Sequence, residues 1–171
     1  MRAKEETVTT AVTLEELVAW NCQSSDWWKA HLDSDPGLLA LPCGIGGNAD
    51  VQAFVRHIWG AELVWSQILT SLEITDYEVW PEGPLNVLFD LHLSAVDNFR
   101  ALLDNPNTLW DEKSVHYPWR RSEQPKPTRR KALAHVLLHS QRHWAQLATL
   151  LRTAGFPSGF RGDLLFNSAM E

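Results

Sequence analysis

Residues 135–155, HVLLHSQRHWAQLATLLRTAG, carry three of the chain's seven histidines at four-residue intervals in an apolar, helix-like segment. Two imidazoles at positions i and i+4 lie one above the other on a helix, close enough to coordinate one metal ion. A helical projection places His139 and His143 at the border of the apolar face and turns His135 toward solvent. The spacing therefore predicts that His139 and His143 form a pair of metal ligands.

This pair needs a further ligand, because a catalytic zinc or related ion usually takes three protein ligands and keeps one position open. His57 is the best candidate, since it flanks the apolar stripe of a second predicted helix. His92, in a third predicted helix, is the alternative. His31 and His116 lie near the ends of predicted loops and are expected at the surface.

Three neutral imidazoles would leave the double positive charge of such an ion uncompensated. That charge lowers the pKa of a bound water toward about 7 or deprotonates a bound thiol outright. Either product is a nucleophile at neutral pH, so the three histidines favour metal-activated attack on a small-molecule substrate. The chain has nine tryptophans, and we expect a tryptophan-rich pocket to hold this substrate.

Two further polar residues lie near the apolar faces of the same helices. Glu62 falls close to the centre of the second helix's apolar stripe, where a carboxylate needs a partner. It either orients a ligand histidine or acts as an acid or base, or else it is a buried cap or pairs with an arginine. Gln146 borders the histidine pair and either bonds an aqua ligand or is a surface amide. Three tryptophans at helical spacing are expected mainly in the core: Trp59, Trp65 and Trp144.

The segment between residues 120 and 131 is rich in basic side chains, although the whole chain carries a formal net charge of −6. One interpretation is a docking patch for an anionic thiol cofactor or a substrate carboxylate. The other, which we prefer, is a solvated loop that pairs with acidic surface elsewhere or across a dimer. The candidate residues are Arg120, Arg121, Arg129 and Arg130.

Four amphipathic segments, separated by stretches that contain Pro or Gly, must position these residues. Thr13 caps the first and can form a capping box with Glu16, and Asp35-Pro36-Gly37 ends it. The other three are expected from a cap at Asn48 or Asp50 to Leu72, from Pro84 or Leu85 to Leu103, and from a cap at Thr128 to Ala154, before Gly155. The pattern predicts an all-α, up-down four-helix bundle with one long irregular connection at residues 108–128 and a short C-terminal helix within residues 156–170.

The composition predicts a single compact domain over residues 1–171. Its net negative charge repels a phosphate backbone, which argues against nucleic acid as a partner. The N-terminus has no signal-peptide run, and no later stretch reads as a membrane span, so we expect a soluble, cytoplasmic protein with no membrane partner. Cys22 and Cys43 have no CxxC spacing and are expected to be reduced.

Several motifs, in order along most of the chain, resemble the DinB (DinB/YfiT-like) family of bacterial metal-binding four-helix bundles. They are LVAWN at 17–21, HIWGAELVW at 57–65, HSQRHWAQL at 139–147, LLRTAGF at 150–156 and GDLLFNS at 162–168. The resemblance implies that one histidine of the second helix and two of the fourth hold the metal: His57, His139 and His143. It also implies nickel or zinc as the divalent metal, and a homodimer.

The resemblance says less about the reaction than about the site. Family members include enzymes that use low-molecular-weight thiols, such as bacillithiol transferases and mycothiol-dependent isomerases, and a shared fold does not select one chemistry. Our first hypothesis is a metal-dependent enzyme that activates a thiol or water, either a thiol S-transferase or a hydrolase. The alternatives are a non-catalytic metal-binding or stress-associated module, and a helical bundle that binds no metal.

Overall fold

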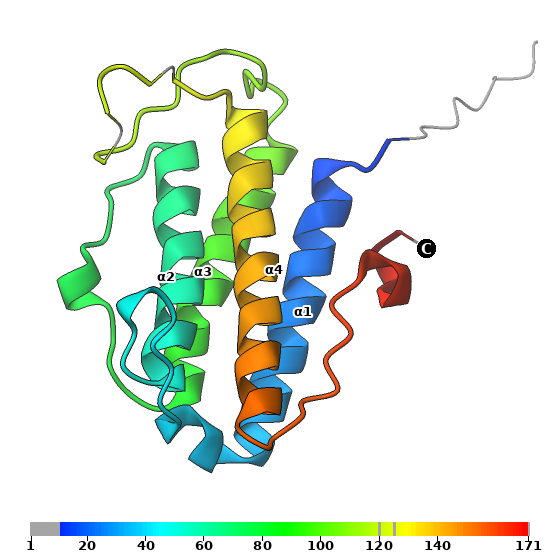
Figure 1. The fold of residues 1–171 in the computed structure, drawn as a ribbon. Helices are drawn as coiled ribbons and strands as arrows, with labels where there is room; N and C mark the ends of the chain where they lie inside the picture. Colours follow the sequence, from blue (N-terminus) through cyan, green and yellow to red (C-terminus); the bar gives the residue numbers. More distant parts are fainter. Residues whose placement is uncertain (1–10, 120, 125, 171) are drawn as a thin grey trace, which may run out of the picture.

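The computed structural model describes residues 11–119, 121–124 and 126–170, which fold as an all-α four-helix bundle (Figure 1). The predicted fold class is therefore confirmed. Within the described residues, the one extended pairing is an isolated bridge between Pro42 and Asp50. None of the described helices is long and apolar enough to cross a membrane. The long helices are α1 (Leu14–Ser34), α2 (Val51–Thr70), α3 (Leu85–Asp104) and α4 (Arg129–Thr153).

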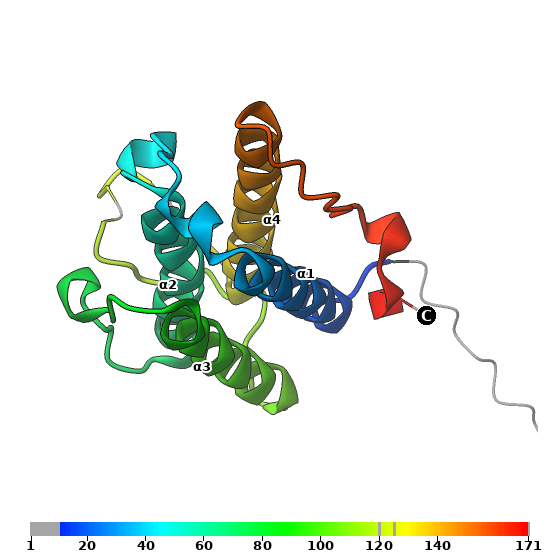
Figure 2. The ribbon, with the colours of Figure 1, turned by 90° about the horizontal axis from the view of Figure 1, so that it is seen from below.

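Helices α2 and α3 run parallel to each other, and both are antiparallel to α1 and α4 (Figures 1 and 2). Contacts between α2 and α3 advance in the same direction along both helices, from Trp59 on Phe89 to Ser66 on Asn98. The connection at residues 71–84 therefore returns along the side of the bundle before α3 begins (Figure 1). The predicted up-down order holds for α1–α2 and for α3–α4, and the structure adds this second long connection, which the sequence analysis did not predict.

Three helices begin at the caps expected from the sequence. Thr13 and Glu16 form the predicted capping box at the start of α1. Of the two candidates for α2, Asp50 is the cap, and its Oδ1 accepts a hydrogen bond from the Ala53 amide at 2.8 Å. Thr128 Oγ1 accepts from the Lys131 amide at the start of α4.

The ends of the helices also follow local chemistry. Helix α2 stops at Thr70, two residues before the predicted end, because Ser71 adopts a left-handed conformation with φ of 59°. Gly155 has a φ of 90° just after α4, as predicted for a terminating glycine. The C-terminal segment differs from the expected short helix, since it forms two single 3-10 turns at Leu164–Phe166 and Ser168–Met170.

The core between the helices is built around aromatic side chains. Trp28 of α1 stacks on Trp144 of α4 with ring centroids 5.4 Å apart, and Trp59 of α2 meets Trp144 edge-on at 5.8 Å. All three indoles are fully buried, which confirms the core assignment of Trp59 and Trp144. Cys22 and Cys43 are free thiols, as expected. The contacts made by Trp144 link α4 to α1 and α2, the second of which carries His57.

Candidate metal centre

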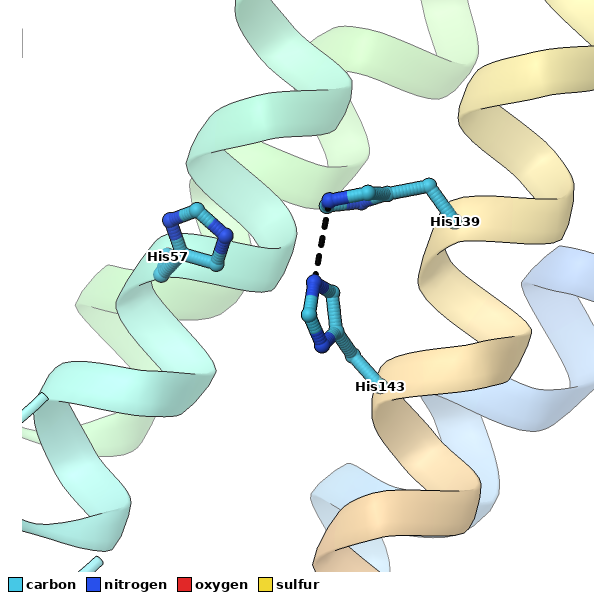
Figure 3. A group of neighbouring side chains, drawn as sticks. All are labelled: His57, His139 and His143. Carbon is cyan, nitrogen blue, oxygen red and sulfur yellow. Dashed lines mark hydrogen bonds between the residues drawn. The ribbon is translucent and has the colours of Figure 1, made fainter. Parts of the chain in front are cut away.

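Three histidines from two helices lie close together, with the His57 ring facing the space beside His139 and His143 (Figure 3). His57 lies on α2, and His139 and His143 lie one turn apart on α4. One ring nitrogen from each lies within 4.8 Å of the others. The Nε2 atoms of His139 and His143 are 2.9 Å apart. The cluster of side chains needed for a three-histidine metal site, predicted from the spacing of the motif, is therefore present.

The surroundings keep all three imidazoles neutral near pH 7. Burial, followed by the neighbouring rings of His143 and His57, lowers the pKa of His139 to about 3. Burial and then the nearby Arg142 guanidinium lower the pKa of His57. For His143, burial lowers the pKa and outweighs the opposing effect of the hydrogen bond that the ring donates to Gln146. Neutral imidazole is the form that binds metal ions, so none of the three rings has to lose a positive charge before a cation enters.

Gln146 determines which nitrogen of His143 faces the cluster. Its Oε1 lies 2.6 Å from His143 Nδ1, and because an amide oxygen can only accept, Nδ1 carries the proton. The lone pair of the His143 ring is then on Nε2, which points toward His139. From the sequence, Gln146 is expected either to bond an aqua ligand or to be a surface amide. Its side chain is exposed, as the second alternative predicts, and it also positions the ring of a ligand candidate.

The three side chains fit a divalent cation. With His143 Nδ1 protonated, the 2.9 Å approach of the two Nε2 atoms requires either a shared proton or a cation between them. His139 Nδ1 is buried and makes no hydrogen bond within the described residues, whereas Nε2 of the same ring contacts His143. An all-imidazole donor set suits zinc, nickel and other first-row ions alike. The site can therefore hold a divalent metal, without selecting which one.

Among the residues that the structure describes, Glu62 makes no hydrogen bond or ion pair with the three histidines or with an arginine, the two kinds of partner considered from the sequence. Its fully buried carboxylate lies with Oε2 2.6 Å from His92 Nδ1, and its Oε1 accepts from Asn21 Nδ2 at 2.8 Å and from Ser140 Oγ at 2.6 Å. His92 is thus the partner of Glu62 and not the third ligand of the histidine cluster. Because Ser140 follows His139 in the chain, Glu62 acts on the site through the position of α4.

A pocket of about 520 Å³ opens beside His57 and His139. Trp65 is half-buried, so its assignment to the core holds only in part: it packs against the core cluster and also lines this pocket. His135 is exposed as predicted, yet its ring packs 5.7 Å from that of Trp65 and also lines the pocket. Aromatic residues from the two long connections, which the sequence analysis did not assign to the site, complete the walls: Tyr77, Trp80 and Trp119.

The wall formed by residues 77–81 is attached to α2 next to His57. The Arg56 guanidinium donates to the carbonyls of Tyr77, Trp80 and Pro81 at 2.7–3.1 Å and lies over the Tyr77 ring at 4.5 Å. Trp80 packs so closely on Gly60 that a Cβ there would lie 1.9 Å from Trp80 Cζ3. The absence of a side chain at Gly60 therefore lets this wall approach the helix that carries His57.

The basic residues of the 120–131 segment have separate environments. Arg130 pairs with Asp111 at 3.1 Å, as the preferred interpretation expects. Arg129 donates to Ser114 Oγ at 3.4 Å and lines a pocket that contains none of the three histidines. Arg121 lines a different pocket, which adjoins the one beside His57. Arg120 lies outside the described residues.

Comparison with known proteins finds neither a family model nor a curated protein that matches the chain. The membership of the DinB family expected from the motifs is therefore still a prediction. The case for function rests on the geometry of the histidines and of the pocket beside them.

Proposed function

We propose that this chain is a DinB-like metal-dependent enzyme in which His57, His139 and His143 hold nickel or zinc. The observation that carries the proposal is the convergence of three neutral imidazoles from α2 and α4 at the edge of an aromatic pocket. Three protein ligands leave a position open for an exogenous group, which is typical of catalytic sites, whereas structural sites are usually closed by four.

A divalent ion bound here would supply the positive charge that deprotonates a thiol or water at neutral pH. The chain contributes the rest. Gln146 holds the His143 ring with Nε2 toward the cluster. The indole walls of the pocket offer apolar surface to an acceptor molecule. This division of roles supports a thiol S-transferase, with a hydrolase as the variant in which water replaces the thiol.

A non-catalytic module is the alternative, in which an ion mainly joins α2 to α4. The pocket beside His57 favours catalysis, because an ion that served only as a cross-link would need no space for a substrate next to it. The resemblance to the DinB family further leads us to propose a homodimer, which analytical ultracentrifugation of the purified chain tests directly.

Metal content is the first experiment. Protein purified without a histidine tag is expected to hold about one nickel or zinc ion per chain by elemental analysis. The variants His57→Ala and His143→Ala are expected to lose this ion. His135→Ala is the matched control, because it removes an exposed imidazole one turn from His139 that is not part of the cluster. Wild-type metal content in both site variants would overturn the proposed ligand set.

Turnover is the second experiment. Metal-loaded protein is incubated with low-molecular-weight thiols and electrophilic acceptors, and loss of free thiol is followed over time. Thiol consumption that requires both the metal and His57 would support the proposed transferase activity. If metal is bound but neither a thiol nor a hydrolysable ester is consumed, the non-catalytic module is the better account.

A further inference from the structure

Two hollows adjoin on the face that carries the histidine cluster. The first is the pocket beside His57 and His139, and the second, of about 650 Å³, lies next to the start of α4. Both are lined by Trp65, Trp119 and His135. We call the two hollows together the trough.

The middle of the trough is aromatic. The rings of Trp65 and Trp119 meet edge to face with centroids 5.6 Å apart, and Tyr117 lies 5.2 Å from Trp65. Trp119 remains 55% exposed in spite of these contacts. A large exposed indole beside a hollow is typical of a surface that a ligand covers, because leaving it in water is unfavourable. Flat aromatic or apolar groups fit this part of the trough best.

The end of the trough farther from the histidine cluster is cationic. Arg121 and Lys131 line the second hollow, and no carboxylate is among the described residues that line it. Asp76 is the acidic residue of the first hollow, which contains His57 and His139. Charge therefore changes along the trough, and an anionic group is favoured at the Lys131 end.

We propose that the trough binds an aromatic compound that carries a metal-binding donor atom at one end and an anionic group at the other. The donor atom faces the histidine cluster, the ring lies against Trp65 and Trp119, and the anion is bound by Lys131 and Arg121. This inference rests on the proposed function for its metal end, and it names the substrate class of that site. The proposed binding of the aromatic ring and of the anionic group depends only on the walls of the trough and not on the metal.

The test compares two benzylic thiols that carry either a carboxylate or a methyl group at the end of the ring opposite the thiol. The anionic probe is 4-(mercaptomethyl)benzoate, and the neutral one is 4-methylbenzyl mercaptan. Quenching of tryptophan fluorescence reports their binding to the full chain loaded with one equivalent of zinc. We expect the anionic probe to bind about tenfold more tightly at low salt, which corresponds to one charge-assisted hydrogen bond. This preference should shrink as ionic strength rises.

Three variants assign the preference to residues. Lys131→Met should remove most of the preference for the anionic probe and should leave the affinity for the neutral probe unchanged. Lys126→Met is the matched control, because Lys126 is exposed in the same segment but does not line the trough, and it should retain the wild-type preference. Trp119→Ala should weaken the binding of both probes by about three- to tenfold. Equal affinity for the two probes, equal effects of the two lysine variants, or no saturable binding would each overturn the proposal.

Metal content, measured on every sample, separates this inference from the proposed function. If the chain takes up no metal, the proposed function fails, and metal-free protein is titrated with 4-methylbenzoate and with neutral 4-methylanisole. A preference for the benzoate that depends on Lys131 would then support the parts of the proposal that concern the ring and the anion. If metal is bound but the chain binds the anionic and the neutral probe with equal affinity, the proposed metal site stands and the proposed substrate class is wrong.

Discussion

Glu62 Oε2 and His92 Nδ1 lie 2.6 Å apart in the interior of the bundle, where both side chains are almost completely buried. The other oxygen of the same carboxylate accepts hydrogen bonds from Asn21 of α1 and Ser140 of α4. One side chain on α2 therefore joins all four helices. Because Ser140 is adjacent to His139, this network also sets how α4 lies against the helix that carries His57.

Replacing Glu62 should destabilise the fold strongly. Glu62→Gln removes the charge that balances His92 and leaves buried polar groups poorly paired, and we expect it to lower the free energy of unfolding by about 2–4 kcal/mol. Urea denaturation followed by circular dichroism measures this value. Glu15→Gln, on the exposed side of α1, is the matched control and should change stability by less than about 0.5 kcal/mol. Wild-type stability in Glu62→Gln would show that the network is dispensable.

The same pair predicts a loss of stability at alkaline pH. Burial disfavours the charged form of His92, but the Glu62 carboxylate and the hydrogen bonds that the ring donates to Cys22 and Glu62 outweigh it and raise the pKa of His92 to about 9. A histidine whose pKa is raised on folding stabilises the folded state in full below about pH 6.5, its pKa in the unfolded chain. This stabilisation is lost as the pH rises through about 9, its pKa in the folded protein.

We therefore expect the free energy of unfolding to fall by about 2–3 kcal/mol between pH 7 and pH 10 from this pair alone. His92→Gln, which cannot carry the charge, should be less stable at pH 7 and should show a correspondingly flatter pH dependence. Urea denaturation at each pH compares the two proteins. Parallel pH profiles would mean that His92 is not charged in the folded protein.

Gln146 should tune metal affinity through His143. Gln146→Leu removes the acceptor for His143 Nδ1–H, and we expect it to weaken metal binding by about 10- to 100-fold. Gln146→Glu keeps an acceptor at the same position and should restore affinity to the wild-type level or above it. Competition with a chromogenic chelator gives the dissociation constants. If the leucine variant binds metal as tightly as wild type, the orientation of the ring does not depend on Gln146.

Gly60→Ala should detach the Trp80 wall of the pocket. The added methyl group would overlap the Trp80 ring, so the indole has to move, and we expect a cost of about 1–3 kcal/mol. Tryptophan fluorescence and protease sensitivity within residues 71–84 report the movement. Gly83→Ala is the matched control, because its nearest side-chain neighbour, Val87 Cβ, lies 3.9 Å away. Metal content should be unchanged in both variants, and an unaltered fluorescence spectrum in Gly60→Ala would contradict the expected displacement.

Much of the candidate site could be anticipated because its signals are local. His139 and His143 are four residues apart on one helix, so their proximity follows from helical geometry alone. The caps at Thr13 and Thr128 likewise depend on side chains that bond amides three residues away. His57 was selected from its place beside an apolar stripe and from the family resemblance, and the structure brings it to the other two rings.

The partner of Glu62 and the walls of the pocket required the tertiary structure. The sequence showed that a carboxylate in an apolar stripe needs a partner, but His92 is 30 residues away, and the pairing depends on how α3 packs against α2. Trp80 and Trp119 lie in connections with no periodic pattern, so their positions depend on contacts with Gly60 and Trp65.

Local spacing and capping chemistry therefore determined the four helices and the histidine pair from the sequence by itself, because these features involve atoms within one or two helical turns. Only the tertiary structure decided the direction of α3, the partner of Glu62 and the aromatic and cationic lining of the trough. Those features join residues far apart in the chain, and they depend on how whole helices and connections pack together.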